Sequence, residues 1–264
     1  MNKEPTKIDY LGDGISEVSL VDRMVQDFAL KVTNAARASY NQEKKEFEPK
    51  DQKLTSFLWD KEHTSPFRHS YYTFQLSMPI IIARQLMKYQ VGSGFRSVEA
   101  GGEEIFIEEF DHFYDIDKGC SWNEVSGRYT QTSDKFYIPK ELRSNPGHGN
   151  KQSSGEYENL ADPEDEDYLS PETIKVMMGW RCMDMLTQYH LYIKNGVAKE
   201  IARMFLPQGM YTKAYWTISL QSVIWFLHQR TKKDAQWEIQ KFAEAVYTLV
   251  EPDLTKMGIA IDNL

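Results

Sequence analysis

The chain has 264 residues, of which 41% are hydrophobic and 27% are charged, and its formal net charge is −8. That composition describes a folded domain with a hydrophobic core, and the acidic balance excludes a protein that binds nucleic acid through a basic surface. An anionic ligand therefore has to be held by a local cluster of Arg and Lys. The aromatic share of 13% favours an oligomer or a planar ligand.

The two cysteines are too few for a disulfide framework or a cysteine-based zinc site. The histidines lack the H-E-x-x-H spacing, so we expect no metal. The opening residues, MNKEPTKIDYLGDG, contain no apolar signal segment, and no stretch is long enough for a transmembrane helix. We therefore expect a cytoplasmic protein without membrane contact.

The first third of the chain predicts strands and helices in succession. Residues 17–22 favour a strand, and apolar side chains at helical spacing predict a helix over about 25–36. A short helix is expected over 53–61. The Tyr- and Thr-rich run HSYYTFQLSM, 69–78, predicts a strand, and Pro79 is expected to begin a helix that continues through IIIARQLMKYQ.

The middle of the chain is less regular. Residues 93–119 are Gly-rich and acidic and are typical of an inserted excursion, in which EIFIEEF predicts a strand. Phe136–Pro139 is expected to be a short extended piece. Residues 143–170 are polar and are interpreted as a long loop, and loops of this length are usually functional or disordered.

The last third predicts a long helix, capped by Ser170 and ended by Gly196. It is followed by a short helix over 197–205, a strand over 211–220, and helices over 222–229 and 235–250. Strands and helices do not alternate regularly, and neither G-x-G-x-x-G nor a P-loop occurs. We therefore predict one α+β domain over 1–264, with a central antiparallel or mixed sheet flanked by long helices.

The stretch SWNEVSGRYT, 121–130, allows two interpretations. If it forms a helical turn, Glu124 and Arg128 make a surface ion pair worth about 0–1 kcal/mol. Alternatively, backbone amides near Gly127, with Arg128 and Ser126, suit a phosphate. A nucleophilic Ser126 lacks the G-x-S-x-G context, so phosphate binding is the favoured role.

Three other polar positions have a plain explanation and a functional one. Gln85 shares a helix face with Lys88 and Tyr89, a pattern that solvated helices also give. Arg203 follows Glu200 by three residues and can pair with it, and Arg230 ends an apolar helix, where a cation suits the helix dipole. The residues alone indicate Arg-containing segments that suit an anionic ligand, and they indicate no reaction.

Taken together, the segments resemble the flavin-dependent thymidylate synthases over roughly 17–250. The matching strings, in order, are EHTSPFRH, ARQ, SWNEVSGRY, FYIP, NKQSSG, NGVAKEIARMFLP, YTKAYWTISL, LHQR and AQWEI. The resemblance implies an α+β homotetramer with active sites shared between subunits. It implies C5 methylation of dUMP to dTMP, with methylenetetrahydrofolate as the carbon source, FAD as the redox cofactor and NADPH as its reductant.

The resemblance also assigns residues by position. Those implied to bind dUMP are Gln85, Lys88, Glu124, Ser126, Gly127, Arg128, Tyr129, Arg203 and Arg230. Those implied to meet FAD are His63, Ser65, Lys88, Tyr89, Gln90, Glu124, Ser219, Gln221 and Trp225. The catalytic members are Glu124, Ser126 and Arg230, and Arg230 matches the arginine that polarises the uracil ring.

Several positions depart from the family pattern. The family's R-H-R reads Lys88-Tyr89-Gln90, the excursion interrupts the signature before Ser126, and Arg68 replaces a common Glu. Lys lacks the planar fork of Arg, so the change is not conservative. The excursion is expected to form a strand or hairpin beside the flavin or over an interface.

These departures leave two alternatives open beside the synthase. The first is a relative that hydroxymethylates dUMP or dCMP at C5 with an altered flavin site. The second is a non-catalytic nucleotide-binding protein.

Overall fold

The computed structural model describes residues 6–88, 98–100, 103–105, 120–128, 133–144, 154, 164, 166–262 and 264. In this part of the chain, five antiparallel strands form a sheet in the order β1-β2-β3-β7-β6. Their bounds are Lys7–Asp9 (β1), Glu17–Arg23 (β2), Tyr71–Pro79 (β3), Cys120–Glu124 (β6) and Tyr211–Ser219 (β7). A separate pair joins β4, Val98–Ala100, to β5, Glu103–Ile105. The predicted α+β class is confirmed.

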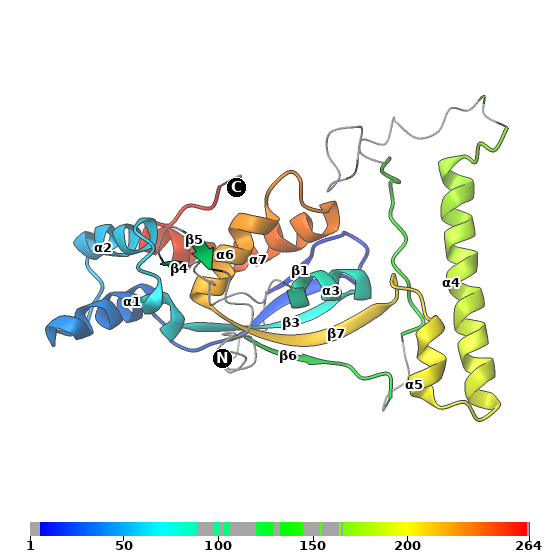
Figure 1. Cartoon of the computed structure of the whole chain (residues 1–264), viewed down its shortest axis with the longest axis horizontal. Helices are drawn as coiled ribbons and strands as arrows, with labels where there is room; N and C mark the ends of the chain where they lie inside the picture. The colour runs from blue at the N-terminus through cyan, green and yellow to red at the C-terminus, as the bar shows by residue number, and fades with distance from the viewer. Residues whose placement is uncertain are drawn as a thin grey trace.

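The described helices lie over one face of the sheet and beyond its ends (Figure 1). They are Phe28–Arg37 (α1), Pro49–Asp60 (α2), Ile80–Lys88 (α3), Pro171–Lys194 (α4), Lys199–Ala202 (α5), Leu220–Arg230 (α6) and Trp237–Met257 (α7). Short 3₁₀ turns lie at Ala38–Tyr40 (η1), Ser65–His69 (η2) and Arg203–Phe205 (η6). No helix of the described residues is both long and apolar enough to cross a membrane.

The core lies between the sheet and helices α1, α6 and α7. Strand β3 alternates strictly, so that Tyr72, Phe74, Leu76 and Met78 are buried while the residues between them face the other side. Trp216 of β7 packs edge-on against Phe226 of α6 at 5.5 Å between ring centroids. The opposite face is polar, which leaves it available for a ligand.

Three predicted elements need correction. Pro79 was expected to begin a helix, but it is the last residue of β3 and pairs with Tyr211, beyond the reach of β2. Helix α2 begins at Pro49 rather than at 53, because a capping box between Glu48 and Asp51 starts it earlier. Helix α7 passes through Pro252 to Met257 instead of ending at 250. The other strands and helices are confirmed within a few residues where they are described. The predicted strand EIFIEEF is described only as far as Ile105, and most of the expected excursion over 93–119 and of the loop over 143–170 lies outside the described residues.

The C-terminal turns of α7 are held beyond their proline by a half-buried ion pair. Asp253 accepts hydrogen bonds from Arg23 Nη2 at 2.6 Å and from Tyr72 Oη at 2.8 Å. Because a proline inside a helix removes one backbone hydrogen bond, these contacts to β2 and β3 explain why the helix continues past Pro252.

Helix α4 stands apart from this core. It packs against α5 and η6, and in Figure 1 it lies beyond the end of the sheet, away from the other long helices. As predicted, Ser170 caps its start by accepting from Thr173 N at 3.2 Å, and Gly196, with φ of 86°, follows its end.

A buried carboxylate ties α2 to α1. Asp51 has a side chain only 1% exposed, and it accepts from Arg37 Nη2 at 2.5 Å, Lys44 Nζ at 3.0 Å and Glu48 N at 3.0 Å. Burial raises the pKa of Asp51, but these donors outweigh it and lower the pKa to about 2. Asp51 therefore stabilises the fold fully above its unfolded pKa, and this stabilisation is lost as the pH falls toward 2.

We predict that Asp51→Asn lowers the free energy of unfolding by about 2 kcal/mol at pH 7, since Arg37 and Lys44 lose their shared counter-ion. The deficit should shrink as the pH falls from about 5 to 2. Urea unfolding followed by circular dichroism at several pH values measures this. Asp60→Asn, an exposed carboxylate at the end of the same helix, is the matched control. Equal losses in the two variants at pH 7 would contradict the prediction.

Candidate functional site

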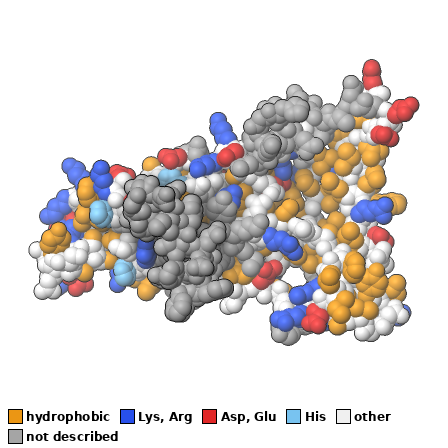
Figure 2. All heavy atoms as spheres, viewed as in Figure 1, with side chains coloured by type: hydrophobic (Ala, Val, Ile, Leu, Met, Phe, Trp, Pro, Cys, Tyr) orange, Lys and Arg blue, Asp and Glu red, His pale blue; other side chains and the backbone are white. Residues whose placement is uncertain are grey.

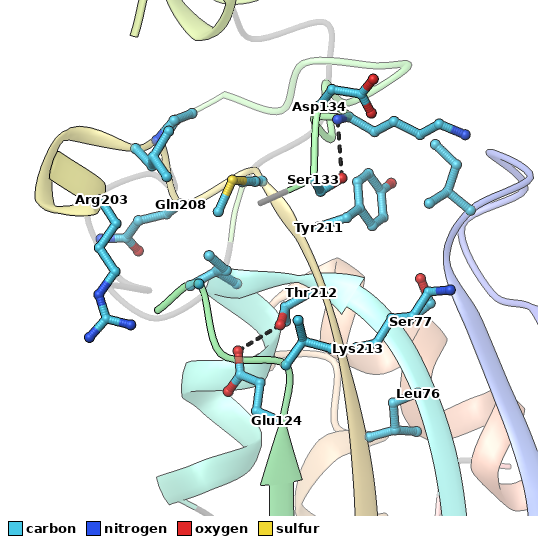
Figure 3. A pocket seen from close by; sticks show the side chains of 18 of the residues that line it. Leu76, Ser77, Glu124, Ser133, Asp134, Arg203, Gln208, Tyr211, Thr212 and Lys213 are labelled. Atoms are coloured by element: carbon cyan, nitrogen blue, oxygen red, sulfur yellow. Dashed lines mark hydrogen bonds between the residues drawn. The ribbon is translucent and has the colours of Figure 1, made fainter. Parts of the chain in front are cut away.

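A cavity of about 930 Å³ lies where β3 ends and β7 begins (Figure 3). Its walls come from the polar face of the sheet, the turn after β6, η6 and the segment that follows η6. Five cations line it against four carboxylates. The cations are Lys7, Arg84, Lys135, Arg203 and Lys213, and the carboxylates are Glu17, Glu124, Asp134 and Glu200. The site thus has a slight cationic excess within an acidic chain, as an anionic ligand requires.

Glu124 is fixed by its neighbours on the sheet. It is the last residue of β6, opposite Ala214 of β7, so the helical turn that was one interpretation of SWNEVSGRY does not form over its first half. Its Oε1 accepts from Thr212 Oγ1 at 2.7 Å, a contact drawn in Figure 3, and its Oε2 accepts from Trp122 Nε1 at 3.2 Å. The carboxylate is therefore oriented along the cavity wall by a strand partner, and not by a helical neighbour.

The turn after β6 carries the predicted phosphate-binding residues. Val125 N donates to Lys213 O at 2.9 Å, which fixes the turn to β7. Ser126 Oγ accepts from both Arg128 N and Arg128 Nε at 3.4 Å, and Gly127 lines the cavity. Arg203 reaches the same cavity from η6 (Figure 3). The structure thus brings Glu124, Gly127 and Arg203 into one cavity, with Ser126 and Arg128 flanking Gly127 in sequence.

The far wall is a tight loop, residues 9–16, which we call the rim loop. Asp13 Oδ1 accepts from Ile15 N at 2.8 Å and Ser16 N at 2.7 Å, while its Oδ2 accepts from Tyr211 Oη. Burial raises the pKa of Asp13, but these donors outweigh it and hold the pKa below its ordinary value. Gly14, with φ of 74°, takes the left-handed conformation that this loop needs and lines the cavity.

Four of the described residues predicted to bind the nucleotide lie outside the cavity lining. They are Ser126 and Arg128, which flank Gly127 in sequence, and Gln85 and Arg230. Gln85 is half-buried on α3, where its Nε2 donates to Gln236 Oε1 just before α7. Arg230 is half-buried at the end of α6. Lys88 ends α3, but its side chain lies outside the described part of the chain, as do Tyr89, Gln90 and Tyr129 entirely.

Of the described residues expected to meet flavin, Glu124 lies in the cavity, whereas Ser65, Ser219 and Gln221 lie at the other end of β3 and β7. Ser219 pairs with Tyr71 at that end, and η2, which begins at Ser65, packs against α6. Gln221 Oε1 accepts from Arg68 Nε at 2.6 Å. Two aromatic positions complete the group. The ring of His63 stacks on Phe57 at 6.4 Å, and Trp225 is 46% exposed.

These two groups are far apart within one chain. Strands β3 and β7 pair over nine residues, from Tyr71↔Ser219 to Pro79↔Tyr211. At about 3.3 Å per residue, the two ends lie roughly 25 Å from each other. Within one chain, the cavity and the residues at the Tyr71–Ser219 end are therefore two separate groups, which we call the two candidate half-sites.

Sequence reasoning missed several side chains of the cavity. Tyr211, Thr212 and Lys213 were interpreted only as part of a strand, although they form its polar wall. The rim loop carried a usable signal in GDG, because an Asp between glycines favours a turn in which its side chain accepts backbone N–H groups.

The fold and the cavity together define an α+β protein with a mixed-charge ligand site at one end of an antiparallel sheet. A family model described as thymidylate synthase complementing protein matches residues 19–254. The chain therefore belongs to this family, which confirms the resemblance that the sequence strings predicted.

Individual relatives agree with this assignment. A flavin-dependent thymidylate synthase from Kosmotoga olearia is 34% identical over 230 residues, covering 87% of this chain and 82% of the relative. The one from Thermus thermophilus is 30% identical over 247 residues, covering 94% and 75%. Among solved structures, the UMP/dUMP methylase PolB from Streptomyces cacaoi, bound with 5-Br dUMP, matches at 25% identity with a TM-score of 0.66. The match covers 94% of this chain and 96% of PolB.

We predict that Tyr211→Phe loosens the rim loop, because Asp13 loses one of its two hydroxyl donors, the other being Ser16 Oγ at 2.8 Å. Amide hydrogen exchange at Ile15 and Ser16 should accelerate several-fold, and the free energy of unfolding should fall by about 1 kcal/mol. Tyr215→Phe, an exposed tyrosine on the same strand, is the control. Unchanged exchange at the rim loop in Tyr211→Phe would show that its other contacts alone hold it.

Proposed function

We propose that this protein is a flavin-dependent thymidylate synthase that methylates dUMP at C5 to give dTMP. The observation that carries this is the convergence of Glu124, Gly127 and Arg203 on one cavity from segments far apart in sequence. The resemblance of the sequence assigns each of them to the nucleotide. The dUMP analogue bound to PolB supports the same ligand class.

The chemistry of the cavity suits a nucleoside monophosphate. Arg203 and Arg128 are suited to bind the phosphate, since guanidinium groups offer paired donors to phosphate oxygens. Ser126 and the backbone around Gly127 add neutral donors. Glu124, held by Thr212, offers a fixed acceptor for a ligand N–H or O–H group.

The proposed role of Arg230 is electrostatic. Methylation at C5 needs negative charge to build up on the uracil ring, and a fixed cation near the ring stabilises it. Arg230 sits at the C-terminal end of α6, where the helix also favours a positive charge. In this proposal Arg230 and Gln85 contact the nucleotide beside the residues of the cavity.

The half-site at the other end of the sheet fits a flavin in part. Trp225 offers an exposed ring for stacking, and Arg68 and Gln221 offer polar groups to an anionic dinucleotide. Ser219 fits less well, because it is 2% exposed and its Oγ accepts from Ser222 N at 3.2 Å to cap α6. When bound, the flavin supplies the reducing equivalents, with NADPH and methylenetetrahydrofolate as the proposed co-substrates.

The distance between the half-sites supports an assembly in which two copies complete one active site. A nucleotide at one end of β3 and a flavin at the other are too far apart to react in one chain, whereas the cavity end of one copy can meet the flavin end of another. We therefore propose a homotetramer with shared sites, as the resemblance implied.

Helix α4 supports the same assembly. Figure 2 shows hydrophobic side chains gathered over α4 and the segment beside it. The largest exposures on α4 are Val176 at 56%, Trp180 at 76%, Met183 at 53% and Leu191 at 53%. Apolar surface of this extent on a soluble chain marks a contact surface, and η6, which carries Arg203 into the cavity, packs directly against this helix.

The function is tested by turnover of the purified protein. We expect it to bind FAD and to convert dUMP to dTMP with NADPH and methylenetetrahydrofolate. Arg203→Ala should raise the KM for dUMP at least about tenfold, because a phosphate contact is lost, while Lys53→Ala, an exposed cation on α2, should not. Mass spectrometry of the product separates the alternatives. A hydroxymethylated nucleotide formed without NADPH, or binding without any product, would refute the synthase.

The assembly has its own test. Trp180→Glu should convert the protein to smaller species in native mass spectrometry and abolish dTMP formation, because each site then lacks its second copy. Tyr40→Glu, which changes an aromatic residue that is 78% exposed elsewhere on the chain, should leave both unchanged. A fully active Trp180→Glu monomer would refute shared sites.

A further inference from the structure

Glu238 is a buried carboxylate that the proposed reaction does not use. It is the second residue of α7 and is 2% exposed. Its Oε1 accepts from Arg143 Nη2 at 2.5 Å and Tyr137 Oη at 3.0 Å, and its Oε2 accepts from Gln236 Nε2 at 2.9 Å. Burying a charge is costly unless donors surround it. We therefore ask which neighbouring side chains this cluster orients.

The carboxylate stays ionised in the folded protein. Burial raises the pKa of Glu238, but the donors from Gln236 and Arg143 outweigh it, and the net pKa lies below its ordinary value. The first turn of a helix also favours a negative charge. At neutral pH the group can therefore only accept hydrogen bonds.

An acceptor-only group imposes a direction on the amides next to it. Gln236 has to turn its Nε2 toward Glu238, which leaves its Oε1 pointing the other way. That oxygen accepts from Gln85 Nε2 on α3. The Nε2 end of Gln85 is thereby committed to Gln236, and among the described residues no donor reaches Gln85 Oε1. The direction set by Glu238 thus passes through one amide to fix the orientation of the next.

The same carboxylate also anchors a segment of the cavity wall. Arg143 and Tyr137 belong to the stretch that follows the cavity-lining residues Ser133–Lys135. Tyr137 N donates to Gly209 O at 2.8 Å, which ties this stretch to the segment entering β7. One oxygen of Glu238 is therefore bonded to the stretch that follows the cavity lining. Its other oxygen is connected to Gln85 through Gln236.

We propose that Glu238 is a positioning residue of the nucleotide site, which orients Gln85 through Gln236. This rests on the proposed function, in which Gln85 contacts the nucleotide. Glu238 itself touches no ligand. Glu238 holds the Gln85 amide in one of its two orientations before dUMP binds. Binding of dUMP therefore does not have to order this amide.

A double-mutant cycle on the full-length protein tests the proposal, with the dissociation constant of dUMP measured by calorimetry. Glu238→Gln keeps the size but removes the acceptor-only character, so it should weaken dUMP binding about tenfold in the native background. In a Gln85→Ala background the same change should have less than about a threefold effect, because the group that Glu238 orients is absent. A merely structural role does not predict this dependence on Gln85.

Two further variants keep the result interpretable. Gln236→Ala breaks the connection while leaving Glu238 bonded to Arg143 and Tyr137, so it should reproduce the loss and its dependence on Gln85 even if Glu238→Gln fails to fold. Glu251→Gln, an exposed glutamate on the same helix, should leave dUMP affinity unchanged.

The outcomes separate the two levels of the argument. If Glu238→Gln and Gln236→Ala each weaken dUMP binding by the same factor in the native and in the Gln85→Ala background, the positioning role is overturned. The proposed synthase activity would still stand. A native protein that does not bind dUMP would overturn both.

Discussion

The pairing of β3 with β7 is the constraint on which the rest of the molecule depends. Nine residues of each strand align without a bulge, although more than a hundred residues separate them in sequence. Every element of functional interest is attached to one end of this pair. The rim loop, the turn after β6 and η6 meet at the Pro79–Tyr211 end, while η2 and the start of α6 meet at the Tyr71–Ser219 end. A sheet of fixed length therefore sets the spacing of the two half-sites, and that spacing makes a second copy necessary for the proposed reaction.

In an acidic protein with a proposed site for an anion, several carboxylates have a structural role as hydrogen-bond acceptors. The half-buried Asp13 accepts several hydrogen bonds from the rim loop and Tyr211, and the buried Glu238 accepts from Arg143, Tyr137 and Gln236. Each carboxylate orders the donors around it. These groups thus act as fixed points that align neutral and cationic side chains within a chain of net charge −8.

Much of the fold was predictable because its signals are local. The alternation in HSYYTFQLSM and the cap at Ser170 depend only on neighbouring residues, and both predictions were confirmed. Pro79 and Pro252 misled the prediction, because tertiary contacts overrode a local preference. One is accommodated at the end of a strand, and the other lies in a helix whose last turns are held by Asp253.

The candidate site was less accessible to sequence reasoning, because it is made by contacts between distant segments. SWNEVSGRY was singled out from the sequence, but only the pairing of β6 with β7 shows that Thr212 orients Glu124. AQWEI was noticed as a string without a role. Its Gln and Glu acquire one only when α7 begins beside α3 and the Tyr137 segment, a meeting that no spacing in the sequence records.

The departures from the family pattern fall mainly on one half-site. At the nucleotide end, Glu124, Gly127 and Arg203 are retained and converge. At the flavin end, Ser219 is committed to the cap of α6, and Gln221 is bonded to Arg68, a cation where the family often has Glu. An added cation and an exposed Trp225 offer charge and stacking in place of hydrogen bonds. Because these two interactions depend less on exact geometry than hydrogen bonds do, a flavin site rebuilt from them tolerates changes in its surroundings that a hydrogen-bonded one would not. The proposed nucleotide end has less latitude at Glu124, since this acceptor is fixed by Thr212 on the partner strand.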